Sequence, residues 1–520
     1  MPENKNYFKK PVYKSPPSKL VAFFKESRDN WKQKFKGAKR NVKRLTEQVR
    51  YWKRQTDDLR RRVKELEEEL EKSEKNSEEC ETPAVKFGEI PAFHKYSYGH
   101  MHLFLRLVLE ASVSMRGASR SLDIVSSFLE LGIEMPSWSA GRLWLLRIGL
   151  YKIERPRTIA DDWIWIIDHT VQLGNEKCMV ILGVRESSLP DCELHLKHED
   201  VEPLALFPVE KSNGEVVFQQ LEETIEKTGV PKQIVMDHGP DVKSGAEKFC
   251  EKYGIMDAYD IKHKGANILK RELKDVSDWE NFSTQAGKTS KKVQQTKFAD
   301  MAPPYQRSKA RYMNLDKLVK WGAKTLVRLD IEKRELGNEF ESCEMKNKFG
   351  WVYEYREQLQ NWKSLVDIVD TAVCFVNFTG LYKGMDVDLR DQLDELPCHP
   401  RFAGVKDELV EFAQAQQSSL GDGDRLLGSS EIIESVFGKY KRLQDDQIKG
   451  GFTGMLLGLA ASVSDLNVET VKNAIDSIPT KKVWRWIQDN VGKSVHARRK
   501  EFNKIVKKEE QKLAEFSCAV

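Results

Sequence analysis

Residues 163–171 read WIWIIDHTV, an apolar and β-branched run that contains a single acidic side chain, Asp168. Such a run predicts a buried β-strand. A core strand normally carries an apolar side chain at each buried position, so a carboxylate at position 168 needs a functional reason. A second such run, 177–185, follows a Gly174-Asn175 turn, and the two runs together predict a β-hairpin.

Two more acids are expected at the ends of later strands. The chain continues with patterns that predict a third extended segment, a helix and two short strands, at 192–207, 216–228, 233–236 and 255–259. Asp237 directly follows the fourth strand, and Asp260 directly follows the fifth, with His263 three residues later. Short acids also occur at strand ends as turn-forming residues, which is the structural alternative for Asp168 and Asp237.

Three antiparallel strands, a helix and two further strands, with acids on the first and fourth, resemble the order of the RNase H-like fold. The resemblance implies a mixed five-stranded sheet that brings Asp168 and Asp237 together at one edge. There they could share hard divalent cations through oxygen ligands. Two ions per active site, Mg²⁺ or Mn²⁺, would activate a water or a 3′-hydroxyl and neutralise the leaving oxygen during displacement at phosphorus.

A third acid is expected in the segment SSEIIESVFGKYK at residues 429–441, which predicts a capped helix. Glu434 and Lys441 would lie on nearly the same face of this helix. Their Glu-x6-Lys spacing resembles the end of the signature of DDE transposases, which implies that Glu434 completes the metal site. The resemblance also implies that Lys441, with Lys439 nearby, contacts the phosphates of the transposon end. Glu431, one turn earlier, is the alternative third acid.

The residues between the second and third acids are mainly helical in pattern, as in 315–327 and 362–375. Their position resembles that of the helical insertion domain of hAT-like transposases, here 266–428. Asp260 and His263 resemble the (Cys/Asp)-x-x-His motif of such families, which implies a supporting role for both. The catalytic domain would then comprise 160–265 and 429–465.

Basic charge is concentrated in two places, although the net charge of the chain is only +5. Residues 1–60 hold 18 basic and 6 acidic residues, a net of +12, and residues 281–330 hold 11 and 3, a net of +8. In the second region we expect phosphate contacts with double-stranded DNA. The candidates are Lys291, Lys292, Arg307, Lys309 and Arg311. A solvated protein surface is the alternative explanation for both regions.

Two further segments precede the predicted sheet. Residues 1–20 are rich in proline and lysine and predict a disordered basic arm. Apolar residues then recur with 4-3 spacing from Phe35 to Leu70, which predicts a coiled coil over 21–75 and therefore a homodimer. A long solvated single helix is the alternative.

The block 91–158 predicts three helices, at 101–114, 119–131 and 138–148, with Gly149 ending the third. Their order is that of a helix-turn-helix DNA-binding domain. Arg142 and Arg147 on the third helix would be available to phosphates or guanine edges. A three-helix bundle without a DNA-binding role has the same pattern.

Composition excludes other classes of protein. The eight cysteines form no C-x-x-C pair, and His169, His238 and His263 have no partner at zinc-site spacing, so a reducing compartment and no zinc are expected. No apolar run reaches the roughly 18 residues that span a bilayer. We expect a soluble, cytoplasmic protein that is nucleoid-associated if prokaryotic, ending in a basic helical region, 466–520.

The function implied by the resemblance is that of a DDE-type DNA transposase of an insertion sequence. Such an enzyme cleaves at terminal inverted repeats and joins the 3′-hydroxyls to target DNA. Two alternatives remain: a non-catalytic, transposase-derived protein that binds DNA and dimerises through the coiled coil, or an RNase H-like nuclease.

Overall fold

The computed structural model describes residues 88–130, 134–173, 176–190, 194–274, 276–305, 315–445, 453–492, 497–507 and 509, with scattered residues between 18 and 64. The chain divides into two compact units, 1–84 and 85–520. In the first unit every described residue is helical. Most of the predicted basic arm and most of the predicted coiled-coil seam lie outside the described residues, so both stay predictions.

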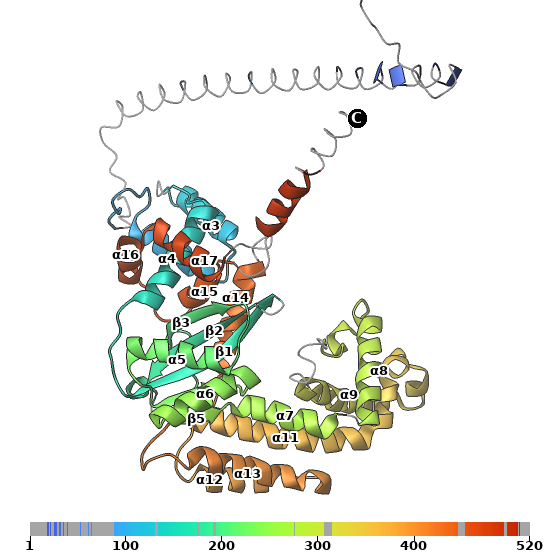
Figure 1. Cartoon of the computed structure of the whole chain (residues 1–520). Coiled ribbons are helices and arrows are strands. Elements are labelled where there is room, and N and C mark those ends of the chain that lie inside the picture. Colours follow the sequence, from blue (N-terminus) through green and yellow to red (C-terminus); the bar gives the residue numbers. More distant parts are fainter. Residues whose placement is uncertain are drawn as a thin grey trace, which may run out of the picture. The chain divides into compact units, whose positions relative to one another are not determined.

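A five-stranded sheet forms the centre of the second unit (Figure 1). Its strands are β1 (Trp163–Leu173), β2 (Glu176–Arg185), β3 (Glu202–Val209), β4 (Gln233–Met236) and β5 (Met256–Tyr259). Their order is β3-β2-β1-β4-β5. The β1-β2 and β2-β3 pairs are antiparallel, whereas β1-β4 and β4-β5 are parallel. This mixed sheet is compatible with the RNase H-like core expected from the sequence.

The alternation of side chains along β1 gives the sheet two buried faces. Trp165 and Ile167 point to the face covered by α5 (Gly214–Thr228) and α6 (Pro240–Tyr253), where Trp165 stacks on Phe249 of α6. Ile164 and Ile166 belong to the opposite core, which also contains buried residues of α14 (Glu431–Asp445). Because side chains alternate, Asp168 belongs to the α14 side.

The described residues between β5 and α14 form the α-helices α7 (Ile261–Leu273), α8 (Ser277–Val293), α9 (Leu315–Leu336), α10 (Glu344–Phe349), α11 (Arg356–Thr379), α12 (Met385–Asp394) and α13 (Ala403–Gln417). The long helix α11 packs along α7 (Figure 1). An aromatic cluster, centred on Phe282 and including Trp321, Trp351 and Trp362, joins α8, α9 and α11. Burial of large rings thus gives these helices a core of their own.

After the helices α7 to α13, the chain returns to the sheet beside the place where it left it. The buried amide of Gln233 donates to the carbonyl of Leu427 at 2.7 Å and accepts from its N–H at 3.1 Å. The N–H of Ile261 donates to the carbonyl of Gly428 at 3.1 Å. The residues before α14 are therefore fixed against β4 and the start of α7.

A helical layer combines elements from both ends of the second unit. It contains α2 (Tyr98–Leu109), α3 (Met115–Phe128), α4 (Trp138–Glu154), α15 (Leu456–Ala461), α16 (Val468–Ser477) and α17 (Thr480–Asn490). The helices α15, α16 and α17 all contact α4. Gly149 lies inside α4 and does not end it, contrary to the prediction. A Cβ at position 149 would lie 1.9 Å from the carbonyl oxygen of Leu457, so this glycine allows α15 to approach the backbone of α4.

The structure contradicts the expected DNA contact of Arg147. This side chain is 5% exposed, and its guanidinium donates to the carbonyls of Ile478 at 2.6 Å and of Ile475. It therefore holds the last turn of α16 against α4. Most of α4 is likewise buried, and burial lowers the pKa of Arg142. From Trp144 onward α4 is mainly a packing helix, and only its first turn, with Trp138 44% exposed, remains accessible to a partner.

None of the helices in the described part of the chain is long and apolar enough to cross a membrane.

Candidate active site

Asp168 and Asp237 are neighbours at the carboxyl end of the parallel strands. The β1-β4 register pairs Ile167 with Met236, and each aspartate is the next residue of its strand. Residues in register on adjacent strands point to the same face of a sheet. The two carboxylates therefore lie on the side of the sheet that α14 covers, near enough for the charge of Asp237 to act on Asp168.

Asp260 continues this row onto the third parallel strand, since Met236 pairs with Tyr259 in β5. Its carboxylate is fully buried and caps α7, accepting from the N–H of Lys262 at 2.7 Å. It also accepts from the N–H of Ser430 at 3.1 Å and from the Ser430 hydroxyl. Asp260 thus joins the first turns of α7 and α14, where its charge is favourable.

Glu434, in the first turn of α14, faces this row of acids. Its carboxylate accepts from the Lys262 ammonium at 2.7 Å. The ring of His263 lies between two acids, with Nε2 3.6 Å from Glu434 Oε1 and Nδ1 3.8 Å from Asp260 Oδ2. His263 therefore lies between two acids of the row, and the supporting role expected for it stays a prediction.

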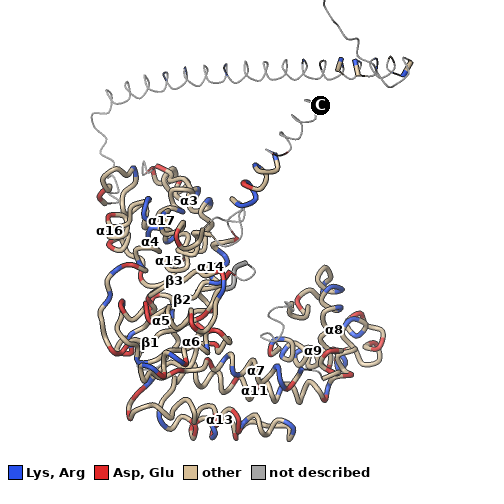
Figure 2. The backbone as a smooth tube through the Cα atoms, viewed as in Figure 1, with Lys and Arg blue, Asp and Glu red and all other residues tan. Residues whose placement is uncertain are grey.

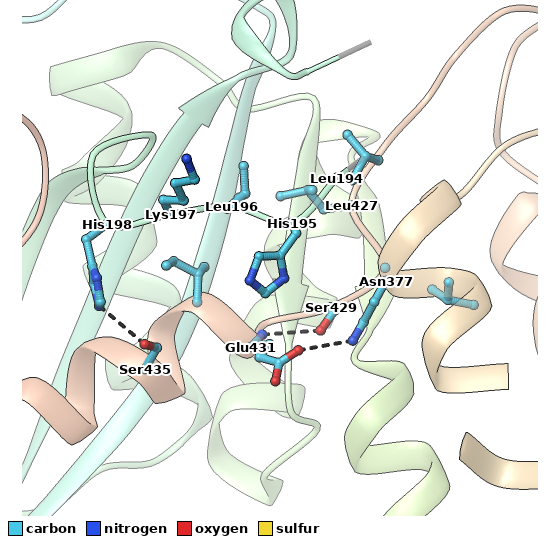
Figure 3. Close-up of a pocket in the computed structure, with 13 residues that line it drawn as sticks. Leu194, His195, Leu196, Lys197, His198, Asn377, Leu427, Ser429, Glu431 and Ser435 are labelled. Carbon is cyan, nitrogen blue, oxygen red and sulfur yellow. Dashed lines mark hydrogen bonds between the residues drawn. The ribbon is translucent and has the colours of Figure 1, made fainter. Parts of the chain in front are cut away.

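Glu431 points to a different place. Its carboxylate accepts from Asn377 Nδ2 at 3.1 Å, and it borders a cavity of about 270 Å³ that His195 and His198 also line (Figure 3). The Lys262 ammonium lies 3.5 Å from Glu431, against 2.7 Å from Glu434. Of the two candidate third acids, Glu434 is the one whose charge raises the pKa of Asp168.

The acids act on one another electrostatically. The pKa of Asp168 is raised well above its ordinary value, first by burial and then by the charge of Asp237. Glu434 and Asp260 raise it further, whereas the hydrogen bond from the His169 N–H lowers it. No basic side chain among the described residues forms an ion pair with Asp168 or Asp237. Asp168 and Asp237 therefore have no basic partner of their own in the described part of the chain, and burial and the neighbouring acids favour the protonated form of Asp168.

Lys262 supplies the nearest cation. Burial lowers its pKa, but the hydrogen bond to Glu434 and the charges of Glu434 and Glu431 outweigh burial, so the pKa lies above its ordinary value. Lys262 is therefore charged at neutral pH.

The donors suit a hard divalent cation, because they are carboxylate oxygens and Asp168 and Asp237 lack a counter-charge. As the side chains stand, no three His, Cys, Asp or Glu residues of the described part are close enough to hold a metal ion. Glu434, held by Lys262, would have to turn toward Asp168 to complete a site.

The residue after Asp237 has a strained backbone. His238 has a φ of 58°, in the left-handed region that side chains rarely adopt. Its ring stacks on Tyr259, with centroids 4.0 Å apart and planes 6° apart, and the N–H of Gly239 donates to Asp237 Oδ1 at 2.9 Å. Strain of this kind is often found at functional sites. Here the tight turn and the ring stack fix the Asp237 carboxylate at the end of its strand.

A second network lies next to Asp168 on the other face of β1. His169 Nδ1 lies 3.5 Å from Asp241 Oδ2, which also forms an ion pair with Lys177 at 3.0 Å. Burial raises the pKa of Asp241, but hydrogen bonds from Lys177 and Ser212 outweigh it, and the pKa is lowered to about 2. Asp241 is thus a structural anion, which holds the end of β1.

The predicted DNA contacts have different surroundings. Lys441 is exposed on α14, whereas the Lys439 ammonium donates to the carbonyl of Ser462 at 3.3 Å and is partly buried. Lys291 and Lys292 are exposed on α8, whose basic residues are visible in Figure 2. A cleft of about 400 Å³ is lined by Lys292 and by other residues, among them Lys288, Lys348 and Trp351. Arg307, Lys309 and Arg311 lie outside the described residues.

Some residues of the site had only weak signals in the sequence. Lys262 lies between Asp260 and His263 in the Asp-x-x-His motif. Its basic side chain within this motif was the one sign that it could contact the acids of the site. Ser430 had the sequence context of a helix cap, but its bond to Asp260 joins positions 170 residues apart. Asn377 had no signal, because a lone amide in a helical pattern predicts nothing about its partner.

The similarity of this chain to a known structure is weak. No protein-family profile and no curated protein matches the sequence. Among solved structures, the chain is similar to that of a "Drosophila P element transposase strand transfer complex". The TM-score is 0.36 and the identity 12%, over 77% of this chain and 97% of that one. A TM-score this low does not establish a shared fold.

Proposed function

We propose that this protein is a DNA transposase of the DDE type, which cleaves DNA at the ends of an element and joins the freed 3′-hydroxyls to target DNA. The observation that supports it is the row of carboxylates at the ends of parallel strands. Asp168 and Asp237 are in register, Glu434 faces them from α14, and the two aspartates have no ion pair with a described basic residue.

Each acid has a distinct part in the proposed reaction. Asp168 and Asp237 would hold two divalent cations, Mg²⁺ or Mn²⁺, and Glu434 would help to hold one of them. The cations would activate the attacking oxygen and neutralise the leaving oxygen at phosphorus. Asp260 and His263 are positioning residues, because they fix the first turn of α14 and the carboxylate of Glu434.

DNA would be held by basic residues outside the acidic row. The cleft lined by Lys288, Lys292 and Lys348 contains three ammonium groups and the ring of Trp351, which suits a phosphate backbone and an adjacent base. Lys441 is exposed further along the helix that carries Glu434. Dimerisation through 21–75 would bring two DNA ends together.

The test is a cleavage and joining assay with Mg²⁺ or Mn²⁺ and DNA that carries the terminal repeats flanking the gene. Asp168→Asn and Asp237→Asn should each lower the rate by at least about a thousandfold. Asp257→Asn, which changes an acid of β5 away from the carboxyl edge, is the matched control and should cleave normally. Strand-joining products distinguish a transposase from a simple nuclease.

One observation favours a second candidate, a non-catalytic DNA-binding protein that dimerises. The Lys262 ammonium forms an ion pair with Glu434, and no three metal-binding side chains of the described part are close together. DNA binding without cleavage at any metal concentration, equally in the wild type and in both aspartate variants, would establish this candidate.

A further inference from the structure

Lys262 lies on α7 between two acids of α14. Its ammonium is 2.7 Å from Glu434 Oε2 and 3.5 Å from Glu431 Oε1. The three side chains are 32%, 30% and 44% exposed for Lys262, Glu434 and Glu431. Asn377 holds the far oxygen of Glu431 at 3.1 Å, so this carboxylate has a fixed place. One ammonium therefore has two acceptors within reach, and it is closer to Glu434.

The closer acceptor is the acid that a metal ion would need. An ammonium within hydrogen-bonding distance of a carboxylate oxygen lowers the affinity of that carboxylate for a divalent cation, because the two cations repel each other at short range. A lysine can move, since its charge sits on a flexible four-carbon stem. The second acceptor, Glu431, lies one helical turn before Glu434 and faces the cavity bordered by Asn377 (Figure 3).

We propose that Lys262 is a positioning residue that competes with divalent cations for Glu434, and that Glu431 receives its ammonium when Glu434 binds metal. The proposal rests on the proposed function, since it takes Glu434 as a metal ligand. It assigns the two acids of α14 to separate tasks. Glu434 binds the cation, and Glu431 binds the lysine that the cation displaces.

The proposal predicts opposite effects for the two partners. Lys262→Gln removes the competitor and should tighten Mn²⁺ binding about fivefold, as expected for the loss of a partly exposed ion pair. Glu431→Gln removes the second acceptor and should weaken binding by a similar factor, about fivefold. The double variant should resemble Lys262→Gln, because without the ammonium Glu431 has nothing to receive. A purely structural role would weaken binding in all three.

The measurement is a calorimetric Mn²⁺ titration of the full chain without DNA, repeated by counting free Mn²⁺ with electron paramagnetic resonance. Lys264→Gln is the matched control, because Lys264 lies on the same helix and forms an ion pair with Glu408 at 2.6 Å. The Mn²⁺ affinity of the Lys264→Gln variant should equal that of the wild type. Lys262→Met provides a second neutral variant, and thermal melting shows that each variant is folded.

The outcomes separate the two proposals. If the wild type binds no Mn²⁺, or if Asp168→Asn binds it equally well, the proposed function fails and the role of Lys262 fails with it. If the wild type binds Mn²⁺ through Asp168 but both Lys262 variants stay within about twofold of it, the role of Lys262 alone is overturned. Changes of the same sign in Lys262→Gln and Glu431→Gln also overturn it.

Discussion

The surroundings of Asp168 oppose its ionisation, and in the metal-free protein they are expected to lower the free energy of unfolding at neutral pH. Burial and the charge of Asp237 raise its pKa well above the ordinary value of 3.8. The folded state therefore binds a proton at pH values where the unfolded state has lost it. The stability of the fold therefore decreases as the pH rises above the unfolded pKa, because Asp168 ionises more readily in the unfolded state than in the folded state.

Asp168→Asn should therefore stabilise the metal-free protein at pH 7, by on the order of 1 kcal/mol. The amide keeps the shape of the side chain and removes the charge. This gain in stability should shrink as the pH falls to 3.8 and below, because the wild-type Asp168 is then protonated in the unfolded state as well as in the folded state. Urea unfolding with EDTA at several pH values measures it. A less stable variant at pH 7 would contradict the explanation.

Asp241→Asn is the control with the opposite sign. The pKa of Asp241 is lowered to about 2, so its charge contributes stability that is present above the unfolded value of 3.8 and is lost as the pH falls through about 2. Removing the charge should destabilise the protein at pH 7, again by on the order of 1 kcal/mol. The difference from the wild type should disappear near pH 2.

At the scale of elements, close approach of backbones decides how the helical layer packs. The helix α4 continues through Gly149 because α15 occupies the space that a side chain would need, with the Leu457 carbonyl 1.9 Å from an added Cβ. The neighbour is backbone, which cannot turn aside as a flexible side chain would. Gly149 therefore acts through tertiary packing, whereas glycines in sequence patterns usually indicate helix ends.

Gly149→Ala should destabilise the second unit by about 2–3 kcal/mol, the usual cost of overpacking a tight contact. Gly287→Ala is the matched control, since Gly287 lies inside α8 with nothing within 4 Å of an added Cβ. It should stabilise the protein by up to about 1 kcal/mol through helix propensity. Denaturant unfolding of both variants compares them, and equal stabilities would show that α15 moves away without cost.

At the scale of the whole molecule, the chain divides into two compact units, residues 1–84 and residues 85–520. The second unit, 85–520, contains the sheet, the helices between β5 and α14, and the helical layer. Its large buried core indicates that it folds without the first unit. Dimerisation is predicted to reside in 21–75.

Removal of residues 1–84 should therefore convert a dimer into a monomer and leave the thermal unfolding of the remaining unit unchanged. Light scattering coupled to size-exclusion chromatography measures the masses of the full chain and of residues 85–520. A dimeric fragment, or a monomeric full chain, would show that the apolar spacing of 35–70 does not specify dimers.

The sequence by itself determined most of the strands and the first two acids. Apolar runs and turn signals are local, so β1, β2, β4 and β5 lie close to where they were predicted. Asp168 and Asp237 then lie side by side because their strands are in register. The third extended segment was expected at 192–207, but β3 begins only at Glu202, because its bounds depend on pairing with β2.

Tertiary structure alone decided the rest of the site. The closer contact of Lys262 with Glu434 than with Glu431, the bond between Asp260 and Ser430, and the burial of Arg147 each depend on residues far apart in the chain. Which face of a helix meets a partner is set by packing across the whole core, and a local pattern only indicates that a face exists. For the same reason a glycine and an arginine of α4, read locally as a helix end and a DNA contact, became packing residues.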